Sequence, residues 1–408
     1  MPAARAYRFP GIESSEHSPA HGPPFAGYQS EIFLRGMAGE VPEHPVSIDE
    51  LARVVEAEAE EKAVGYVFGA AGREATMAEN AAAFRRARIV PRMLRDVGDR
   101  DLSVEVCGTA MPAPLGLAPI GVQSIAHPDG ELAVARAASA VGLTMCASTV
   151  SSFTLEEIAA AAPGPKWFQL YWPRDPELAT SFVQRAELAG YGAIVVTLDT
   201  FLPGWKTRDL QRAWQPFLEG VGIANYLADP VFGALLPAPP EEDRQAAIGQ
   251  FVYQFSNPEL TWKDLEHLRG ATELPILLKG ILHPDDARMA AEAGIDGVVV
   301  SNHGGRQVDG AIASLDALPD IAEAAGDELA VLLDSGIRSG ADAFKALALG
   351  ADAALVGRPY LWGLANGGEA GVLAVLRGLL AELDLTVGLS GYRSIDEIGP
   401  DALSLAAE

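Results

Sequence analysis

Apolar residues recur along the chain in short uninterrupted runs, which are separated by longer stretches of mixed character. The runs cover residues 114–120, 144–148, 167–171, 193–199, 275–280, 297–303, 330–336 and 353–358. Continuous apolarity over this length is typical of parallel strands that are covered on both faces. Segments such as ELAVARAASAVG, PDDARMAAEAG and ADAFKALALG lie between the runs, and their amphipathic pattern predicts helices.

The spacing of the runs predicts the fold. Successive runs mostly start 22 to 33 residues apart, which is the length of one strand and one helix. Eight such units predict an α/β protein of the (β/α)8 TIM barrel type. Helical periodicity over 48–67 and a second helix over 77–86 predict a helical extension before the barrel.

Two segments depart from the barrel pattern. Residues 1–27 are rich in Pro, Gly, Ser and His, so we expect a flexible arm before a single domain over 28–408. Its histidines His17 and His21, with His44 farther on, could bind a metal, but a solvated tail is the simpler interpretation. The fourth and fifth runs are 82 residues apart, which indicates an insertion at about 201–260. An insertion after a barrel strand lies over the active-site face. It is either a lid, which could be partly disordered, or an oligomer contact or decoration.

Composition narrows the possible partners. The 30 basic and 55 acidic residues give a net charge of −25, which disfavours nucleic acid and anionic membranes. Cys107 and Cys146 both lie in apolar surroundings, with no spacing typical of a disulfide framework or a metal site. No apolar stretch has the length of a membrane helix, and the amino terminus lacks a signal-peptide pattern. These features favour a cytoplasmic protein.

Polar residues follow most of the predicted strands, at the rim where barrel enzymes place their reactive groups. The motif SNHGGRQ at 301–307 is the most informative of these rim segments. An imidazole such as that of His303 accepts a proton near neutral pH, and the guanidinium of Arg306 can bind a carboxylate through two hydrogen bonds. The two glycines between them allow the backbone to turn both side chains into one pocket. Together they suit a substrate whose carboxylate adjoins a carbon that loses a proton or a hydride.

The last two predicted strands indicate a phosphate site. DSGIRSG and GRP place glycine amides, Arg338 and Arg358 where barrels often bind a phosphate group. Lys279, two strands earlier, would then face the middle of the ligand, where it could stabilise a ring that accepts electrons. Flavin mononucleotide (FMN) has both features, although composition alone does not select it over other phosphorylated ligands.

From about Tyr28 to the carboxyl terminus, the chain resembles the FMN-dependent 2-hydroxy-acid oxidases and dehydrogenases, of which glycolate oxidase and lactate oxidase are examples. SNHGGRQ matches the active-site signature of this family. The further motifs look most like those of lactate 2-monooxygenases: GYQSEIF, PRMLRDVGDRDLSVEV, FQLYWP, VTLDT followed by GW, KGILHPDDA, DSGIRSGAD, GRPYLWG and GYRSIDEI.

The resemblance implies a role for each matching residue. His303 would be the catalytic base and Asp199 the carboxylate that pairs with it. The substrate would be bound by Arg306, Tyr66, Tyr171, His303 and Lys206. The ring of FMN would be contacted by Pro119, Ile120, Gly121, Ser148, Gln169, Thr197, Lys279 and Ser301. The ribityl chain and phosphate would be held by Asp334, Ser335, Gly336, Arg338, Gly357 and Arg358.

The resemblance also implies the reaction and the assembly. A small (S)-2-hydroxy acid would be oxidised to the 2-oxo acid with O2 as the reoxidant, in a homo-oligomer such as a tetramer or octamer. Either the oxo acid and H2O2 are released, or lactate is converted to acetate, CO2 and water by monooxygenation. His303 could remove the hydroxyl proton as a hydride leaves, or the α-proton first. An FMN-dependent isomerase and a non-catalytic flavoprotein are the alternatives from other classes.

Two residues depart from the family pattern. Lys206 in GWKTRDL stands where relatives have an arginine, so it keeps the charge but loses the planar fork. Phe68 stands where the monooxygenases have a small residue, and it would reshape the pocket if it pointed inward. Both departures bear on the choice of substrate.

Overall fold

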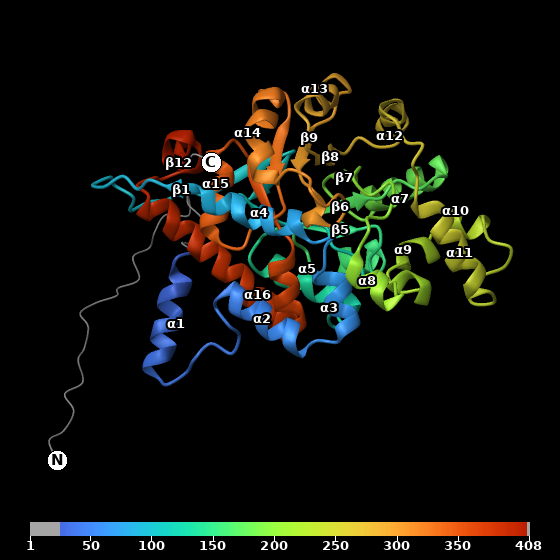
Figure 1. Cartoon of the computed structure of the whole chain (residues 1–408), viewed down its shortest axis with the longest axis horizontal. Helices are drawn as coiled ribbons and strands as arrows, with labels where there is room; N and C mark the ends of the chain where they lie inside the picture. The colour runs from blue at the N-terminus through green and yellow to red at the C-terminus, as the bar shows by residue number, and fades with distance from the viewer. Residues whose placement is uncertain (1–24, 406–408) are drawn as a thin grey trace, which may run out of the picture.

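A closed barrel of eight parallel strands forms the centre of the computed structural model, which describes residues 25–405 (Figure 1). The strands are β4 (Leu115–Leu117), β5 (Thr144–Ser148), β6 (Lys166–Leu170), β7 (Ile194–Thr197), β8 (Ile276–Ile281), β9 (Gly297–Val300), β10 (Ala330–Leu333) and β11 (Ala353–Val356). They follow the order of the chain around the barrel, which closes between β11 and β4. The predicted TIM barrel is therefore confirmed, with each strand lying within its predicted run or extending one residue beyond it.

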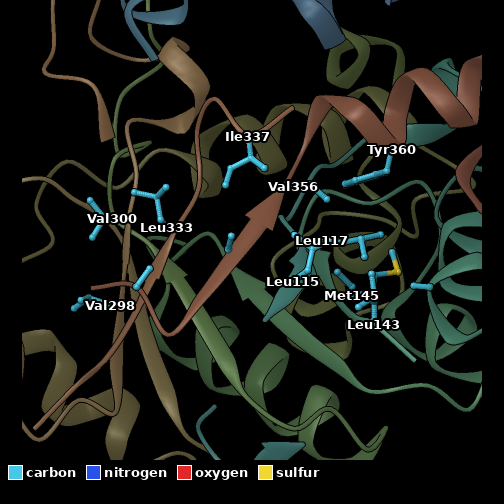
Figure 2. Packing of buried hydrophobic residues seen from close by; sticks show 14 of the residues in the cluster. Leu115, Leu117, Leu143, Met145, Val298, Val300, Leu333, Ile337, Val356 and Tyr360 are labelled. Atoms are coloured by element: carbon cyan, nitrogen blue, oxygen red, sulfur yellow. The ribbon is translucent and has the colours of Figure 1, made fainter. Parts of the chain in front are cut away.

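Side chains of the strands alternate between two hydrophobic clusters. In β9, Val299 faces the barrel interior, whereas Val298 and Val300 pack outward against the helices. Figure 2 shows part of the outer cluster, including Leu333 of β10 and Val356 of β11. Because both faces are buried, nearly every strand position is apolar, which explains why the sequence shows runs rather than alternation.

Helices surround the barrel and return the chain between strands. They are α5 (Gly130–Ala140), α6 (Leu155–Ala161), α7 (Pro176–Leu188), α13 (Pro284–Glu292), α14 (Ser314–Ala325), α15 (Gly340–Ala348) and α16 (Arg358–Leu389). Two small antiparallel sheets lie outside the barrel: β1 (Ala87–Ile89) with β12 (Leu403–Leu405), and β2 (Val104–Val106) with β3 (Thr109–Met111). Short 3₁₀ turns η1 (Gln123–Ile125), η5 (Ile395–Glu397) and η6 (Pro400–Ala402) complete these connections.

The amino-terminal extension is helical, but the single helix predicted over 48–67 is wrong. The structure has α1 (Gly27–Met37), α2 (Ile48–Glu58), α3 (Glu61–Phe68) and α4 (Ala75–Arg86). Ala59 is extended, with ψ of 159°, and it separates α2 from α3. The acidic run EAEAEE crosses this break, where repulsion between Glu56 and Glu60 would oppose one continuous helix. The change of direction lets Leu51 of α2 and Val67 of α3 both be buried.

The predicted arm lies almost entirely outside the described residues, as do His17 and His21. His44 is described, and its Nδ1 lies 2.8 Å from Oδ1 of Asn366. Within residues 25–405, no helix is both long and apolar enough to cross a membrane.

The segment between β7 and β8 is largely helical. It contains α8 (Thr207–Arg212), η2 (Pro216–Glu219), α9 (Ala224–Leu227), α10 (Pro230–Ala234), α11 (Arg244–Phe255), η3 (Trp262–Asp264) and α12 (Leu265–Arg269). Figure 1 shows α8 to α11 gathered on one side of the barrel. Asp229 and Asp243 cap α10 and α11 through their side chains, so these helices have local start signals that the mixed composition concealed.

Candidate active site

A cavity of about 300 Å³ lies where the carboxyl ends of the strands meet the segment between β7 and β8. Residues from α3, from the loops that follow most barrel strands and from this segment line it. Most of the predicted site residues are among them: Tyr66, Pro119, Ile120, Gly121, Tyr171, Lys206, Lys279, His303, Arg306, Asp334, Ser335, Gly336, Arg338, Gly357 and Arg358. The remaining ones contact lining residues or one another: Asp199 and Ser301 bond to His303, Thr197 is paired with Lys279 in the sheet, and Ser148 bonds to Val150 and to Gln169.

His303 and Asp199 form a close pair at the ends of β9 and β7. His303 Nδ1 lies 2.7 Å from Oδ1 of Asp199, and its Nε2 lies 3.4 Å from the hydroxyl of Tyr171. His303 begins the turn η4 (His303–Gly305), and its φ of 58° is unusual for a residue with a side chain. A hydrogen bond of 3.0 Å from His303 N to Ser301 Oγ holds this backbone conformation. One ring nitrogen is therefore fixed, and the other faces the cavity.

The glycines of SNHGGRQ are required by close packing as well as by the turn. Gly304 and Gly305 have φ of 65° and 77°. A Cβ on Gly304 would come within 2.8 Å of Nη1 of Arg358, and one on Gly305 within 2.6 Å of Met77 N. These approaches bring His303 and Arg306 to one cavity, as the motif predicted.

The electrostatic environment keeps the imidazole neutral at pH 7. Burial lowers the pKa of His303, although the Asp199 carboxylate beside it acts in the opposite direction. Burial favours the neutral form of Asp199 too, but the neighbouring His303 and Lys279 outweigh it and hold the pKa of this carboxyl below its usual value. Burial raises the pKa of the Tyr171 phenol, so its hydroxyl stays protonated. The pair thus combines a neutral imidazole with an ionised carboxylate.

Lys279 of β8 is paired across the barrel mouth. Its Nζ lies 3.0 Å from Oδ2 of Asp334 and donates to Ser301 Oγ at 2.8 Å. Both charged side chains are buried, with 3% and 7% of their surface exposed. Burial acts against the charged lysine, but the Asp334 and Asp199 carboxylates prevail and raise its pKa. The ammonium group is therefore a fixed cation at the centre of the barrel mouth.

Two arginines at the ends of β10 and β11 have no such partner. Among the described residues, neither Arg338 nor Arg358 forms an ion pair with a carboxylate. Arg358 donates only to the carbonyl oxygens of Gly304 and Gly69, at 3.1 and 3.0 Å. Burial and the positive charges of Arg338 and Arg306 lower its pKa, and burial lowers that of Arg338 to about 10. The buried Arg358 and the half-buried Arg338, neighbouring cations without a counter-ion among the described residues, are suited to bind an anion.

Arg306 and Lys206 bring two further cations to the cavity. Arg306 donates to Gly69 O at 2.7 Å, and its guanidinium lies 5.6 Å from the centre of the Tyr66 ring. Burial, together with the nearby Arg306, lowers the pKa of Lys206 to about 8. Burial also raises the pKa of Tyr66, which leaves its hydroxyl as a donor. These groups can bind a carboxylate at the cavity.

Phe68 does not point into the cavity. Its ring stacks on that of Trp362 at 5.7 Å between centroids, and it is not among the residues that line the cavity. It contributes to the core, so its size does not reshape the pocket.

Several buried polar atoms near the cavity lack partners among the described residues, and they test whether a flavin fits. Ser148 donates to Oε1 of Gln169 at 2.7 Å, which orients the amide and leaves its Nε2 without a partner. Thr197 Oγ1 and Arg358 Nε are also buried and unpaired. Such groups are costly unless they meet a ligand or water. Gly121 packs against Val150, where a Cβ would lie 2.4 Å from Val150 O, so only glycine fits at this position of the lining. These residues fit a polar, flat ring with an anionic tail.

Some residues of the site were missed by the sequence analysis. Thr200 and Gln307 lie against the His303–Asp199 pair, and Phe217, Phe251 and Phe255 form an aromatic roof over the cavity. Adjacent rings in this roof are 5.3 to 5.7 Å apart. The sequence motifs that contain some of these residues were noticed, since Gln307 belongs to SNHGGRQ and two of the phenylalanines belong to FVYQF. Their inward orientation depends on the path of the segment between β7 and β8.

A (β/α)8 barrel with a histidine–aspartate pair, an anion site and unpaired ring-binding groups defines an oxidoreductase of the flavin type. The family model described as FMN-dependent dehydrogenase matches residues 55–405. The chain belongs to this family, and FMN is its cofactor, as SNHGGRQ and the accompanying motifs predicted.

Individual relatives extend this result. An L-lactate oxidase of Lysinibacillus sphaericus (strain C3-41) is 43% identical over 367 residues, which are 90% of this chain and 94% of the relative. An FMN-dependent alpha-hydroxy acid dehydrogenase of Penicillium citrinum is 42% identical over 387 residues, covering 93% and 96%. The crystal structure of a mandelate oxidase superposes with a TM-score of 0.79 at 39% identity, covering 89% of this chain and all (100%) of that one.

Proposed function

We propose that this protein oxidises an (S)-2-hydroxy acid to the 2-oxo acid at FMN, with O2 as the reoxidant. The observation that carries the proposal is the orientation of His303. Its Nδ1 is fixed by Asp199, and its Nε2 faces a cavity that Arg306 also lines. The relatives named for lactate, mandelate and alpha-hydroxy acids support this substrate class.

The substrate carboxylate would bind at the cations of the cavity. Arg306 offers two parallel donors, and Lys206 adds a second positive charge. Tyr66 and Tyr171, which keep their hydroxyl protons, would donate hydrogen bonds to substrate oxygens. Binding the carboxylate at this end places the carbon that bears the hydroxyl group near His303.

His303 would act as the base because its imidazole is neutral in the free enzyme and its Nε2 can accept a proton. After the transfer, the Asp199 carboxylate stabilises the imidazolium through the 2.7 Å contact to Nδ1. The arrangement serves equally for removal of the hydroxyl proton with hydride loss, or of the α-proton first.

FMN, when bound, supplies the acceptor for the two electrons of the oxidation. Its ring would be held by Pro119, Ile120, Gly121, Ser148, Gln169, Thr197, Lys279 and Ser301. Its ribityl chain and phosphate would be held by Asp334, Ser335, Gly336, Arg338, Gly357 and Arg358. In this proposal, the unpaired atoms of Gln169, Thr197 and Arg358 gain partners, and the paired Lys279 provides a fixed cation beside the ring.

The fate of the oxo acid distinguishes two forms of the reaction. The motif resemblance favours lactate 2-monooxygenation, in which lactate and O2 give acetate, CO2 and water. The aromatic roof of Phe217, Phe251 and Phe255 supports this form, because a covered cavity can retain the oxo acid until oxygen reacts. A plain oxidase, in contrast, would release the oxo acid and H2O2. In either case we propose that the segment 201–260 acts as a lid.

The assembly of the protein into a homo-oligomer and its location in the cytoplasm stay predictions.

Anaerobic reduction followed by product analysis tests the proposal. The yellow holoenzyme is mixed with lactate, glycolate or mandelate without air, and the flavin absorbance is followed. At least one acid is expected to bleach it. Air is then admitted, and acetate, 2-oxo acid and peroxide are measured. Acetate with little peroxide would establish monooxygenation, and oxo acid with equivalent peroxide an oxidase. Failure of a broad panel of 2-hydroxy acids to bleach FMN-loaded protein would refute the proposal.

A further inference from the structure

A continuous chain of hydrogen bonds links the backbone of the proposed lid to the His303–Asp199 pair. The backbone N–H of Gly204 donates to Oε1 of Gln307 at 2.9 Å. Nε2 of Gln307 donates to the hydroxyl oxygen of Thr200 at 2.5 Å. That hydroxyl donates to Oδ1 of Asp199 at 2.9 Å, and Oδ1 also lies 2.7 Å from His303 Nδ1. Neither Thr200 nor Gln307 was assigned a role above.

The direction of every bond in this chain is fixed by its first donor. A backbone N–H can only donate, so the amide of Gln307 must present its oxygen to Gly204 and its NH2 group to Thr200. The Thr200 oxygen accepts from this NH2 group, and its single proton is directed to Asp199 Oδ1 at 2.9 Å, since the other neighbour, His303 Nδ1, is farther away at 3.4 Å. Asp199, which the neighbouring His303 and Lys279 keep ionised against the effect of burial, accepts this hydrogen bond at Oδ1. His303 consequently donates from Nδ1, which leaves Nε2 as the acceptor that faces the cavity.

We infer that Thr200 and Gln307 are positioning residues that hold Asp199 ionised and His303 in the Nδ1–H tautomer when the 200–204 loop is in place. The inference rests on the proposed function for its effect on turnover. It goes beyond the proposed function because it states that His303 can act as the base only when the 200–204 loop is in place.

The packing of the loop supports this coupling. Gly204 lies so close to the SNHGGRQ turn that a Cβ on it would come within 2.3 Å of Arg306 O. Lys206 follows two residues later at the cavity. Thr200 is 9% exposed, so water competes little for its hydroxyl. The contact between Gly204 and the SNHGGRQ turn therefore positions three groups at once: the base His303, its carboxylate Asp199 and the second substrate cation Lys206. If the loop opened at Gly204, the Gln307 amide would lose the bond that orients it.

A double-mutant cycle tests the inference. Thr200→Val and Gln307→Leu each remove two consecutive hydrogen bonds of the chain with little change in volume. Each is expected to slow anaerobic flavin reduction about tenfold and to displace the acidic limb of the pH profile of kcat/KM, while KM changes little. Because the chain acts as a unit, the double variant should be no slower than either single one. Thr200→Ser, which keeps the hydroxyl, should restore the wild-type rate and pH profile.

A second readout does not depend on turnover. Nitrogen-15 NMR of histidine-labelled holoenzyme reports which ring nitrogen of His303 carries the proton. The wild type should show the Nδ1–H tautomer, and Thr200→Val a mixture. Wild-type rates and tautomer in Thr200→Val, or fully multiplicative losses in the double variant, would overturn the inference. If no 2-hydroxy acid reduces the wild-type flavin but the tautomer still responds to Thr200→Val, the proposed function fails and the positioning inference stands.

Discussion

The two ends of the active-site cavity differ in how their buried charges are balanced. At the first end, His303 after β9 is paired with Asp199 after β7 at 2.7 Å, and Lys279 of β8 is paired at 3.0 Å with Asp334, which follows β10 at the boundary between the two ends. At the ends of β10 and β11, Arg358 is buried and Arg338 half-buried, and neither has a carboxylate partner among the described residues. The sequence already separates a motif with a base from a phosphate site, but it does not show which of these charges are paired.

The difference separates groups that are positioned in advance from groups that need a ligand. A buried charge is strongly unfavourable unless it is paired, so the pairs at the first end hold their geometry within the protein alone. The arginines at the second end repel each other, and only an anion can offset that cost. We therefore propose that the first end serves the chemistry, which needs fixed geometry, and that the second holds the phosphate of FMN.

His303→Gln should have the largest effect, because it removes the proton acceptor from the positioned end. Glutamine keeps a similar size and can still contact Asp199. We expect flavin reduction by the best substrate to slow by about 10³–10⁴-fold, which is the upper part of the range for general bases. The FMN absorbance should be retained, since the phosphate and ring groups lie elsewhere. Rapid-mixing measurement of anaerobic bleaching gives the rate.

The matched control is His267→Gln, which changes an exposed histidine that contacts Thr180 on the outside of the barrel. It should leave both the rate and the FMN content unchanged. Undiminished reduction by His303→Gln would refute the assignment of the base.

Arg358→Met and Lys279→Met should have opposite effects on the stability of the flavin-free protein. Lys279→Met leaves Asp334 buried without a counter-charge, with only the Ser335 hydroxyl among the described residues donating to it, and should destabilise the flavin-free protein by about 3–5 kcal/mol. Arg358→Met removes an unpaired buried cation, so stability should stay the same or rise. Arg358→Met should instead weaken FMN binding: we expect the affinity of the protein for FMN to drop about 100-fold, or about 3 kcal/mol. Thermal unfolding of the apoprotein and fluorescence titration with FMN measure the two quantities.

The contrast between these two variants is the decisive result. A large loss of stability in Arg358→Met without a loss of FMN affinity would show that the arginine is structural, and it would remove the distinction between the two ends.

The sequence could predict elements whose signal is local. Continuous apolar runs identified the barrel strands because both of their faces are buried, and strand-tip polarity located His303 and Arg306. Pairing across the barrel has no local signal: Lys279 and Asp334 come from β8 and β10, which are separated by β9. The same limitation concealed the Gly204–Gln307–Thr200 chain. It also concealed the orientation of Phe68, which depends on Trp362 nearly 300 residues away.

Lys206→Arg should have the smallest effect, and it concerns a residue at which the motif resemblance predicts an arginine. The pKa of Lys206 is lowered to about 8 by burial and by Arg306, while Asp209 and Asp199 act in the opposite direction. Below pH 8 the ammonium adds to Arg306 in binding a carboxylate. As pH rises through 8 it loses its charge, so KM of the wild type should increase, by about tenfold at pH 9.5, which corresponds to one charge-assisted hydrogen bond.

Arginine stays charged over this range, so Lys206→Arg should have a KM that is nearly constant from pH 7 to pH 9.5. His303 and the two pocket tyrosines do not titrate there, because their pKa values are shifted below and above it, respectively. The dissociation constant of oxalate, followed by the flavin spectrum at each pH, gives the same comparison without turnover. An equal rise in both proteins would assign the pH dependence to another group, and a flat wild-type profile would show that Lys206 does not contact the carboxylate.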